Sequence, residues 1–168
     1  NNNTVEGCFI HGHRRGIFIR DSRGNQIGGQ TLVPGRFPGN ILSDNESAGI
    51  EIGHSDTIFG SHIIEGNLIG TDSTGMMAAG NENGISISNP DGFQVRIGGT
   101  DSRSRNIISG NTRRGIQLGH SSTSTTSGAV VQGNYIGTDI TGTTALPNQT
   151  GVSLGAVPHT IGGPELGA

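Results

Sequence analysis

Two carboxylates and two pairs of arginines are the side chains of this chain that could act on a polymer. They are Glu51, Glu65, Arg14, Arg15, Arg113 and Arg114. A glycoside hydrolase needs two carboxyl groups about 5 to 10 Å apart. Arginines on the same face would hold the carboxylates of an acidic sugar polymer. The sequence therefore permits a polysaccharide-active lyase or glycoside hydrolase, provided that the fold brings these side chains together.

Three Thr-Asp dipeptides could instead supply oxygen ligands to calcium. Their acids are Asp72, Asp101 and Asp139. Calcium prefers about six to eight oxygens, usually from several carboxylates, and each dipeptide offers one carboxylate. The Asp-x-Thr-Gly spacing fits an Asx turn equally well, because the carboxylate can cap backbone N–H groups two residues on. A calcium-stabilised adhesive module stays open, and no other cofactor is expected.

The histidines offer weaker chemistry. His11 and His13 lie close together in the sequence. His54 and His120 hold equivalent repeat positions and are expected about 10 Å apart, too far to share one zinc ion. We expect these four histidines, together with His62, to be solvated surface residues and not metal ligands.

All of these residues lie in a chain built from internal repeats. The segment 40–53 recurs as 106–119, and 66–75 recurs as 133–142. The chain has 31 glycines and 4% aromatic residues, a composition that disfavours helices. A repeat of this kind indicates a solenoid, because a single unit cannot bury its own apolar face.

Each repeat contains three short strand signals separated by turn residues. One is a glycine followed by alternating apolar residues, as in 49–52. The second is a β-branched residue, a variable residue and a glycine, as in 64–66, and the third usually begins with asparagine, as in 106–108. The alternation predicts apolar side chains inside and polar side chains outside. The glycine that closes the second signal is expected at a corner with positive φ.

The asparagine that opens the third signal recurs as Asn40, Asn67, Asn106 and Asn134. Stacked amides of this kind can bond to one another and to the backbone, so we predict a structural ladder at one corner. Cys8 takes the same place in the first repeat and is expected to be a small, inert, buried residue.

The pattern predicts a single domain, 1–168, that is a parallel β-helix with about five rungs of three short strands. Long and short rungs alternate, so their protruding loops should line up on one side. Both ends lie within a repeat and no cap is evident, which favours a fragment of a longer array. Uncapped rungs would also permit end-to-end self-association.

Segments 133–142 and 105–111 resemble repeats of the right-handed parallel β-helix family, the pectin-lyase-like superfamily in its broad sense. Within it, they are similar to repeats of large exported bacterial proteins of unassigned function. The resemblance covers essentially the whole chain, and it implies a right-handed coil and a secreted or cell-surface location in bacteria. It is weak for activity, because this fold hosts lyases, hydrolases and adhesins alike.

Composition narrows the function further. The net charge of −3 without a basic block argues against nucleic acid, and no apolar run is long enough to span a membrane. All ten basic residues are arginine and Trp is absent, so a lysine base and a tryptophan platform for sugar are excluded. The arginine pairs precede the same repeated glycine and are expected two rungs apart, which suits solvated turns as well as a binding stripe.

We therefore expect a rigid structural or surface-interaction module, adhesion-like and without a catalytic site. A polysaccharide or another cell-surface molecule would be its partner. The polysaccharide-active enzyme and the calcium-stabilised module are the alternatives.

Overall fold

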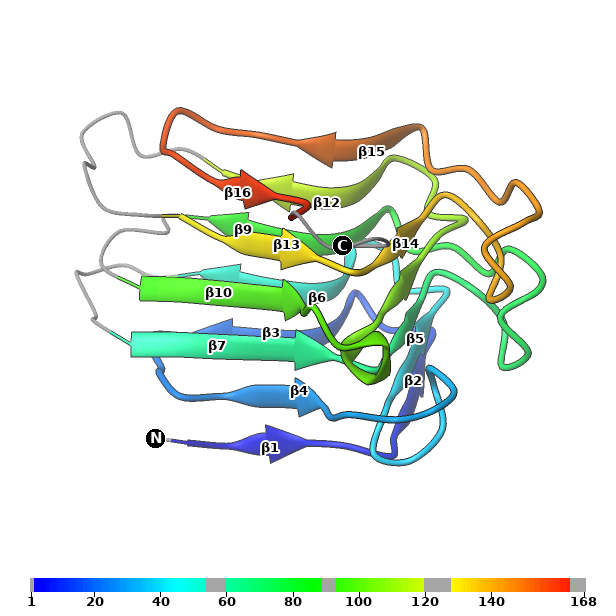
Figure 1. Ribbon diagram of the computed structural model, residues 1–168, viewed down its shortest axis with the longest axis horizontal. Helices are drawn as coiled ribbons and strands as arrows, with labels where there is room; N and C mark the ends of the chain where they lie inside the picture. The colour runs from blue at the N-terminus through cyan, green and yellow to red at the C-terminus, as the bar shows by residue number, and fades with distance from the viewer. Residues whose placement is uncertain (1, 54–59, 89–92, 120–127, 164–168) are drawn as a thin grey trace.

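Three parallel β-sheets wind around one apolar core and form a β-solenoid (Figure 1). The structure, a computed structural model, describes residues 2–53, 60–88, 93–119 and 128–163. These residues contain strands β1 to β16 and one 3-10 helix, η1 (Ser102–Ser104), so the predicted all-β parallel solenoid is confirmed. Within this described part of the chain, no helix has the length and apolar character needed to cross a membrane.

Each strand signal of the sequence forms its own sheet. Sheet A contains, in spatial order, β1 (Thr4–Val5), β4 (Gln26–Gly28), β7 (Gly60–Glu65), β10 (Phe93–Gly98), β13 (Val130–Gln132) and β16 (Thr160–Ile161). Sheet B contains β2 (Phe9–His11), β5 (Ile41–Ser43), β8 (Leu68–Ile69), β11 (Ile107–Ile108) and β14 (Tyr135–Ile136). Sheet C contains β3 (Arg15–Arg20), β6 (Ala48–Gly53), β9 (Asn83–Ser88), β12 (Arg114–Leu118) and β15 (Thr150–Ser153).

The core consists of stacked columns of β-branched side chains. In sheet C one column in register is Ile17, Ile50, Ile85, Ile116 and Val152. The three central isoleucines of this column are 0% exposed. β-branched side chains pack well on a pleated surface, and burying each one contributes about 1.5–3 kcal/mol. Stacking between rungs therefore supplies the core that a single rung lacks.

Sheet B departs from the predicted alternation, because both of its faces are apolar. Leu42 and Ile69 belong to the central core. Leu68 and Ile107 are the neighbours of such core residues along their strands and so face outward, yet they are 1% and 0% exposed. A Cβ added to Gly35 would lie 2.6 Å from Cγ of Leu68, which shows how closely a loop covers this face. The prediction of polar outer residues is wrong for sheet B.

Two sets of protruding loops flank sheet B. The loops 70–82 and 137–149 connect sheet B to sheet C, and the N–H of Ile140 donates to the carbonyl of Gly75 at 2.9 Å. The predicted alignment of these loops is confirmed. A second set, 29–40 and 99–106, connects sheet A to sheet B, and the N–H of Thr31 donates to the carbonyl of Arg103 at 2.9 Å. The rung between each pair turns tightly, so loops from alternate rungs stack directly.

The predicted asparagine ladder is present at the corner between sheets A and B. The backbone N–H and the Nδ2 of Asn40 both donate to Oδ1 of Asn67, at 3.0 and 2.9 Å. The same pair of bonds joins Asn67 to Asn106 and Asn106 to Asn134. Each Nδ2 also donates to a backbone carbonyl. Cys8 donates its N–H to Asn40 as an equivalent residue should, but its side chain is exposed, so the prediction of burial is wrong.

A second ladder, which the sequence analysis did not predict, lines the corner between sheets B and C. The N–H and Nδ2 of Asn45 donate to Oδ1 of Asn81 at 3.1 and 2.8 Å. Asn81 bonds in the same way to Asn111, and Asn111 to Asn148. His13 donates its N–H to Asn45 and starts this ladder as Cys8 starts the first. In every copy of the first strand signal except the first, an asparagine three or four residues before the glycine marks this ladder in the sequence.

The corner glycines follow the prediction in part. Gly7, Gly66 and Gly133 have the expected positive φ at the third place of the second strand signal. Where two glycines adjoin, the positive φ falls on the first of them, 74° at Gly28 and 77° at Gly98. The predicted place is wrong for those copies, because the chain turns one residue earlier there.

Replacing Asn67 by alanine tests the ladder. Asn67 is fully buried, accepts two hydrogen bonds from Asn40 and donates to Asn106. We expect Asn67→Ala to lower the free energy of unfolding by at least about 2 kcal/mol, because several buried groups lose their partners. The matched control is Asn148→Ala, a half-buried residue on the last rung of the second ladder. Chemical denaturation should show the larger loss at Asn67, and equal losses would contradict this account.

Candidate functional site

Glu51 lies on the outer face of sheet C. Its carboxylate forms an ion pair with the guanidinium of Arg15, and Oε2 lies 3.4 Å from Nε. The Arg15 guanidinium also lies 4.2 Å from the centre of the Phe18 ring, and Phe18 is the register neighbour of Glu51. Glu51 is thus part of a surface cluster of an acid, a cation and an aromatic ring.

Glu65 lies in sheet A, at the end of β7. It is buried, and its Oε2 accepts a bond from Nη2 of Arg96 at 2.9 Å. Arg96 also donates to the carbonyl of Gly98, which fixes the guanidinium against the corner. Glu51 and Glu65 belong to different sheets and pair with different arginines. The structure therefore does not bring together the two carboxylates that the enzyme alternative needs.

The arginine pairs do not form a continuous stripe, which was one of the two arrangements that the sequence left open. Arg15 and Arg114 share one register column, but Ala48 and Asn83 lie between them. They are three rungs apart, about 14 Å, and the expected separation of two rungs is wrong. The remaining arginines have separate surroundings. Arg113 pairs with Glu82 at 3.0 Å, Arg114 donates to Gln117 at 3.4 Å, and Arg14 is exposed.

The three aspartates cap their own loops. Asp72 accepts bonds from the Oγ1 of Thr74 and from the N–H groups of Met76 and Met77. Oδ1 of Asp139 accepts the N–H and Oγ1 of Thr141, at 3.1 and 2.7 Å, as the Asx-turn interpretation requires.

Asp101 caps η1 and holds Arg103 through both backbone and guanidinium, the latter at 2.6 Å. Each of the three carboxylates therefore accepts hydrogen bonds from donors in its own loop, which accounts for the spacing of the Thr-Asp segments.

These hydrogen bonds lower the pKa of the carboxyls. The hydroxyl of Thr141, followed by backbone N–H groups, lowers the pKa of Asp139 to about 2. The guanidinium and N–H of Arg103 lower the pKa of Asp101 to about 2. At Asp72 partial burial raises the pKa, but the bonds from Thr74 and the loop backbone outweigh it and the net shift is downward.

The histidines differ in their surroundings. His54 and His120 lie outside the described residues. His11 is exposed and stacks on Phe9 with ring centres 4.7 Å apart. His62 is only 1% exposed, and its Nδ1 shares a hydrogen bond of 3.2 Å with Asn25, so the prediction of a solvated residue is wrong there. Among the described residues, no three His, Cys, Asp or Glu side chains gather as a metal site would require.

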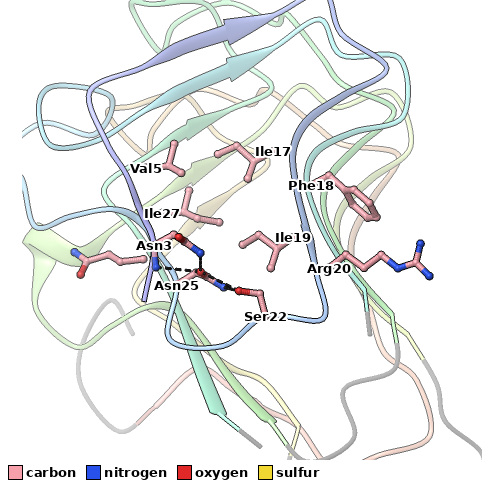
Figure 2. A pocket seen from close by; sticks show the side chains of 10 residues that line it. Asn3, Val5, Ile17, Phe18, Ile19, Arg20, Ser22, Asn25 and Ile27 are labelled. Atoms are coloured by element: carbon pink, nitrogen blue, oxygen red, sulfur yellow. Dashed lines mark hydrogen bonds between the residues drawn. The ribbon is translucent and has the colours of Figure 1, made fainter. Parts of the chain in front are cut away.

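A hollow of about 380 Å³ lies at the first rungs of the solenoid. Figure 2 shows Val5, Ile17, Ile19 and Ile27 pointing into it, while Phe18 points away. The four aliphatic residues belong to the core columns or pack against them. End-to-end self-association stays a prediction.

A second hollow lies over sheet B, between the two sets of loops. Its volume is about 390 Å³, and it is lined by Leu32, Val33, Pro34, Ser102, Arg103, Arg105 and Ile140. Leu32 is 88% exposed and Val33 is 46% exposed. We call this hollow the sheet B groove. The groove was not predicted from the sequence, although the apolar run 32–34 inside a loop and the paired apolar residues of sheet B were signals for it.

Comparisons with protein-family models, curated proteins and solved structures returned no match to this chain. The strand pairing and the side-chain hydrogen bonds themselves define the class of protein, a parallel β-solenoid with asparagine ladders.

The lowered pKa of Asp139 predicts acid sensitivity. A carboxyl whose pKa is depressed on folding stabilises the fold above its ordinary value of 3.8, and this stability is lost as the pH falls through about 2. We expect the melting temperature (Tm) of Asp139→Asn to lie below that of wild type at pH 6, and the two to converge toward pH 2. The exposed Asp44→Asn serves as control and should follow wild type. Parallel curves for Asp139→Asn and wild type would contradict the prediction.

Calcium binding by the aspartate loops has its own test. Because Asp72, Asp101 and Asp139 already accept bonds from their own loops, we expect the same Tm with added calcium and with a chelator. A Tm that rises with calcium in wild type, and not in Asp139→Asn, would instead support the calcium-stabilised alternative.

Proposed function

We propose that this solenoid is a rigid structural and surface-interaction module of an exported bacterial repeat protein. It would keep a fixed spacing along its axis and present its loops to a polysaccharide or another cell-surface partner. The bacterial, exported and pectin-lyase-like character comes from the resemblance of its repeats. The rigidity is supported by hydrogen bonds between the rungs.

Two asparagine ladders carry this proposal. They run along two of the three corners, and in the central rungs each member holds both the next rung and a backbone carbonyl. Buried amides satisfied in this way resist bending, because tilting one rung breaks bonds at both corners. A carboxylate pair poised for catalysis has less support, since Glu51 and Glu65 lie in different sheets and each is engaged by an arginine.

A distance measurement between the first and last strands of sheet A tests the rigidity. Thr4 in β1 and Thr160 in β16 are exposed and lie five strand spacings apart in the sheet. With Cys8→Ser as background, spin labels at Thr4→Cys and Thr160→Cys should give one narrow distribution near about 24 Å by pulsed electron resonance. Labels at Phe18→Cys and Ser153→Cys, four spacings apart in sheet C, should give about 19 Å as the matched pair.

Broad or double distributions from both pairs would contradict a rigid module. The enzyme alternative has a separate test. It requires the protein to release unsaturated or reducing products from polygalacturonate, and it requires Glu51→Gln to abolish that release. No product release is expected.

A further inference from the structure

The sheet B groove exposes apolar side chains on a part of the molecule that is held firmly. Leu32 and Val33 lie in the loop after β4, which is anchored by Thr31 N–H on the Arg103 carbonyl and by Gly35 N–H on the Gly66 carbonyl, at 2.9 and 2.8 Å. The facing wall is Ile140, whose loop is bonded to the loop before it. Exposed aliphatic side chains that gather in one patch beside polar residues are typical of an interaction surface.

Arg105 supplies a charge to this groove. Its guanidinium lies 4.0 Å from the centre of the Tyr135 ring, and its Nε donates to the carbonyl of Gly133 at 2.8 Å. Within the described residues, no partner is recorded for its two terminal nitrogens. The neighbouring Arg103 differs, because Asp101 neutralises it. A flat guanidinium with its plane and position fixed is suited to bind a carboxylate through two parallel bonds.

The shape and chemistry favour a peptide over a saccharide. The groove walls are aliphatic, whereas sugar rings stack on the faces of aromatic rings. No aromatic residue lines the groove among the described residues, and the Tyr135 ring is covered by Arg105 on one face. A Cβ on Gly142 would lie 2.6 Å from the Tyr135 ring, so the loop packs tightly against that ring as well.

We propose that the sheet B groove binds an extended apolar peptide segment that carries one acidic side chain, with the carboxylate on Arg105 and aliphatic side chains between Leu32, Val33 and Ile140. This inference rests on the proposed interaction function and names the partner for it. Because the groove is built from loops and not from the ladders, the peptide can bind without altering the solenoid.

Two blocked heptapeptides test the proposal, Ser-Val-Leu-Glu-Leu-Val-Ser and the same sequence with Gln in place of Glu. Titration calorimetry should show the Glu peptide binding about tenfold more tightly to wild type. Arg105→Gln should remove this preference, and Arg105→Lys should restore only part of it. Leu32→Ser together with Val33→Ser should weaken both peptides, and these exposed positions carry little risk for folding. Arg14→Gln and Leu154→Ser, exposed residues outside the groove, are matched controls and should bind as wild type.

Absence of binding of either peptide up to about 1 mM would overturn the proposal. Binding that ignores Arg105→Gln and the serine variants would also overturn it. Oligogalacturonate that binds wild type and not Arg105→Gln, with no peptide binding, would assign the groove to a saccharide instead. The spin-label distances remain the separate test of the rigid module, so failure of one does not imply failure of the other.

Discussion

The rest of the structure depends on the bonds that one asparagine makes to the rung beside it. In each ladder the Oδ1 of one asparagine accepts the N–H and the Nδ2 of the equivalent residue in the adjacent rung. This arrangement requires every rung to present the same residue in the same place. The asparagine comes immediately or shortly before the next strand, as Asn40 precedes β5 and Asn81 precedes β9. It is the point at which the chain returns to the solenoid after a turn of any length.

That constraint decides where the chain can vary. Extra residues are inserted upstream of an asparagine, in 29–39 and in 70–80, so the ladder and the strands keep their register. Long turns at one corner alternate with tight ones, and a long loop therefore contacts its counterpart two rungs away. The loops at both corners cover sheet B, and this cover explains how Leu68 and Ile107 can face outward and still be buried. The groove is a consequence of the same alternation.

The sequence predicts the features that repeat at a fixed interval and misses those that depend on loop length. The three strand columns and the first ladder recur regularly, and their register is as predicted. The second ladder was hidden because its asparagines do not stand directly before a strand, and their distance to the next strand varies. The following strand glycine comes four residues after Asn45 and three residues after Asn81. The alternation of residues shows which face of a strand Glu51 or Glu65 takes. It does not show which charged side chains lie beside each of them, so their separate pairing with Arg15 and Arg96 could not be predicted.

The distribution of charge follows from the same geometry. A stacked sheet offers its outer residues as flat ladders, so each acid meets the side chains of the next rung, as Glu51 meets Arg15 and Glu65 meets Arg96. Such pairs neutralise the walls of the solenoid. A hollow that contains an unpaired charge can form only where the chain leaves the regular rung. Arg105 lies in such a segment, the turn between η1 and β11. Recognition in this molecule is therefore expected in the loops, where residues can change without breaking a ladder, and not along the strands that fix its length.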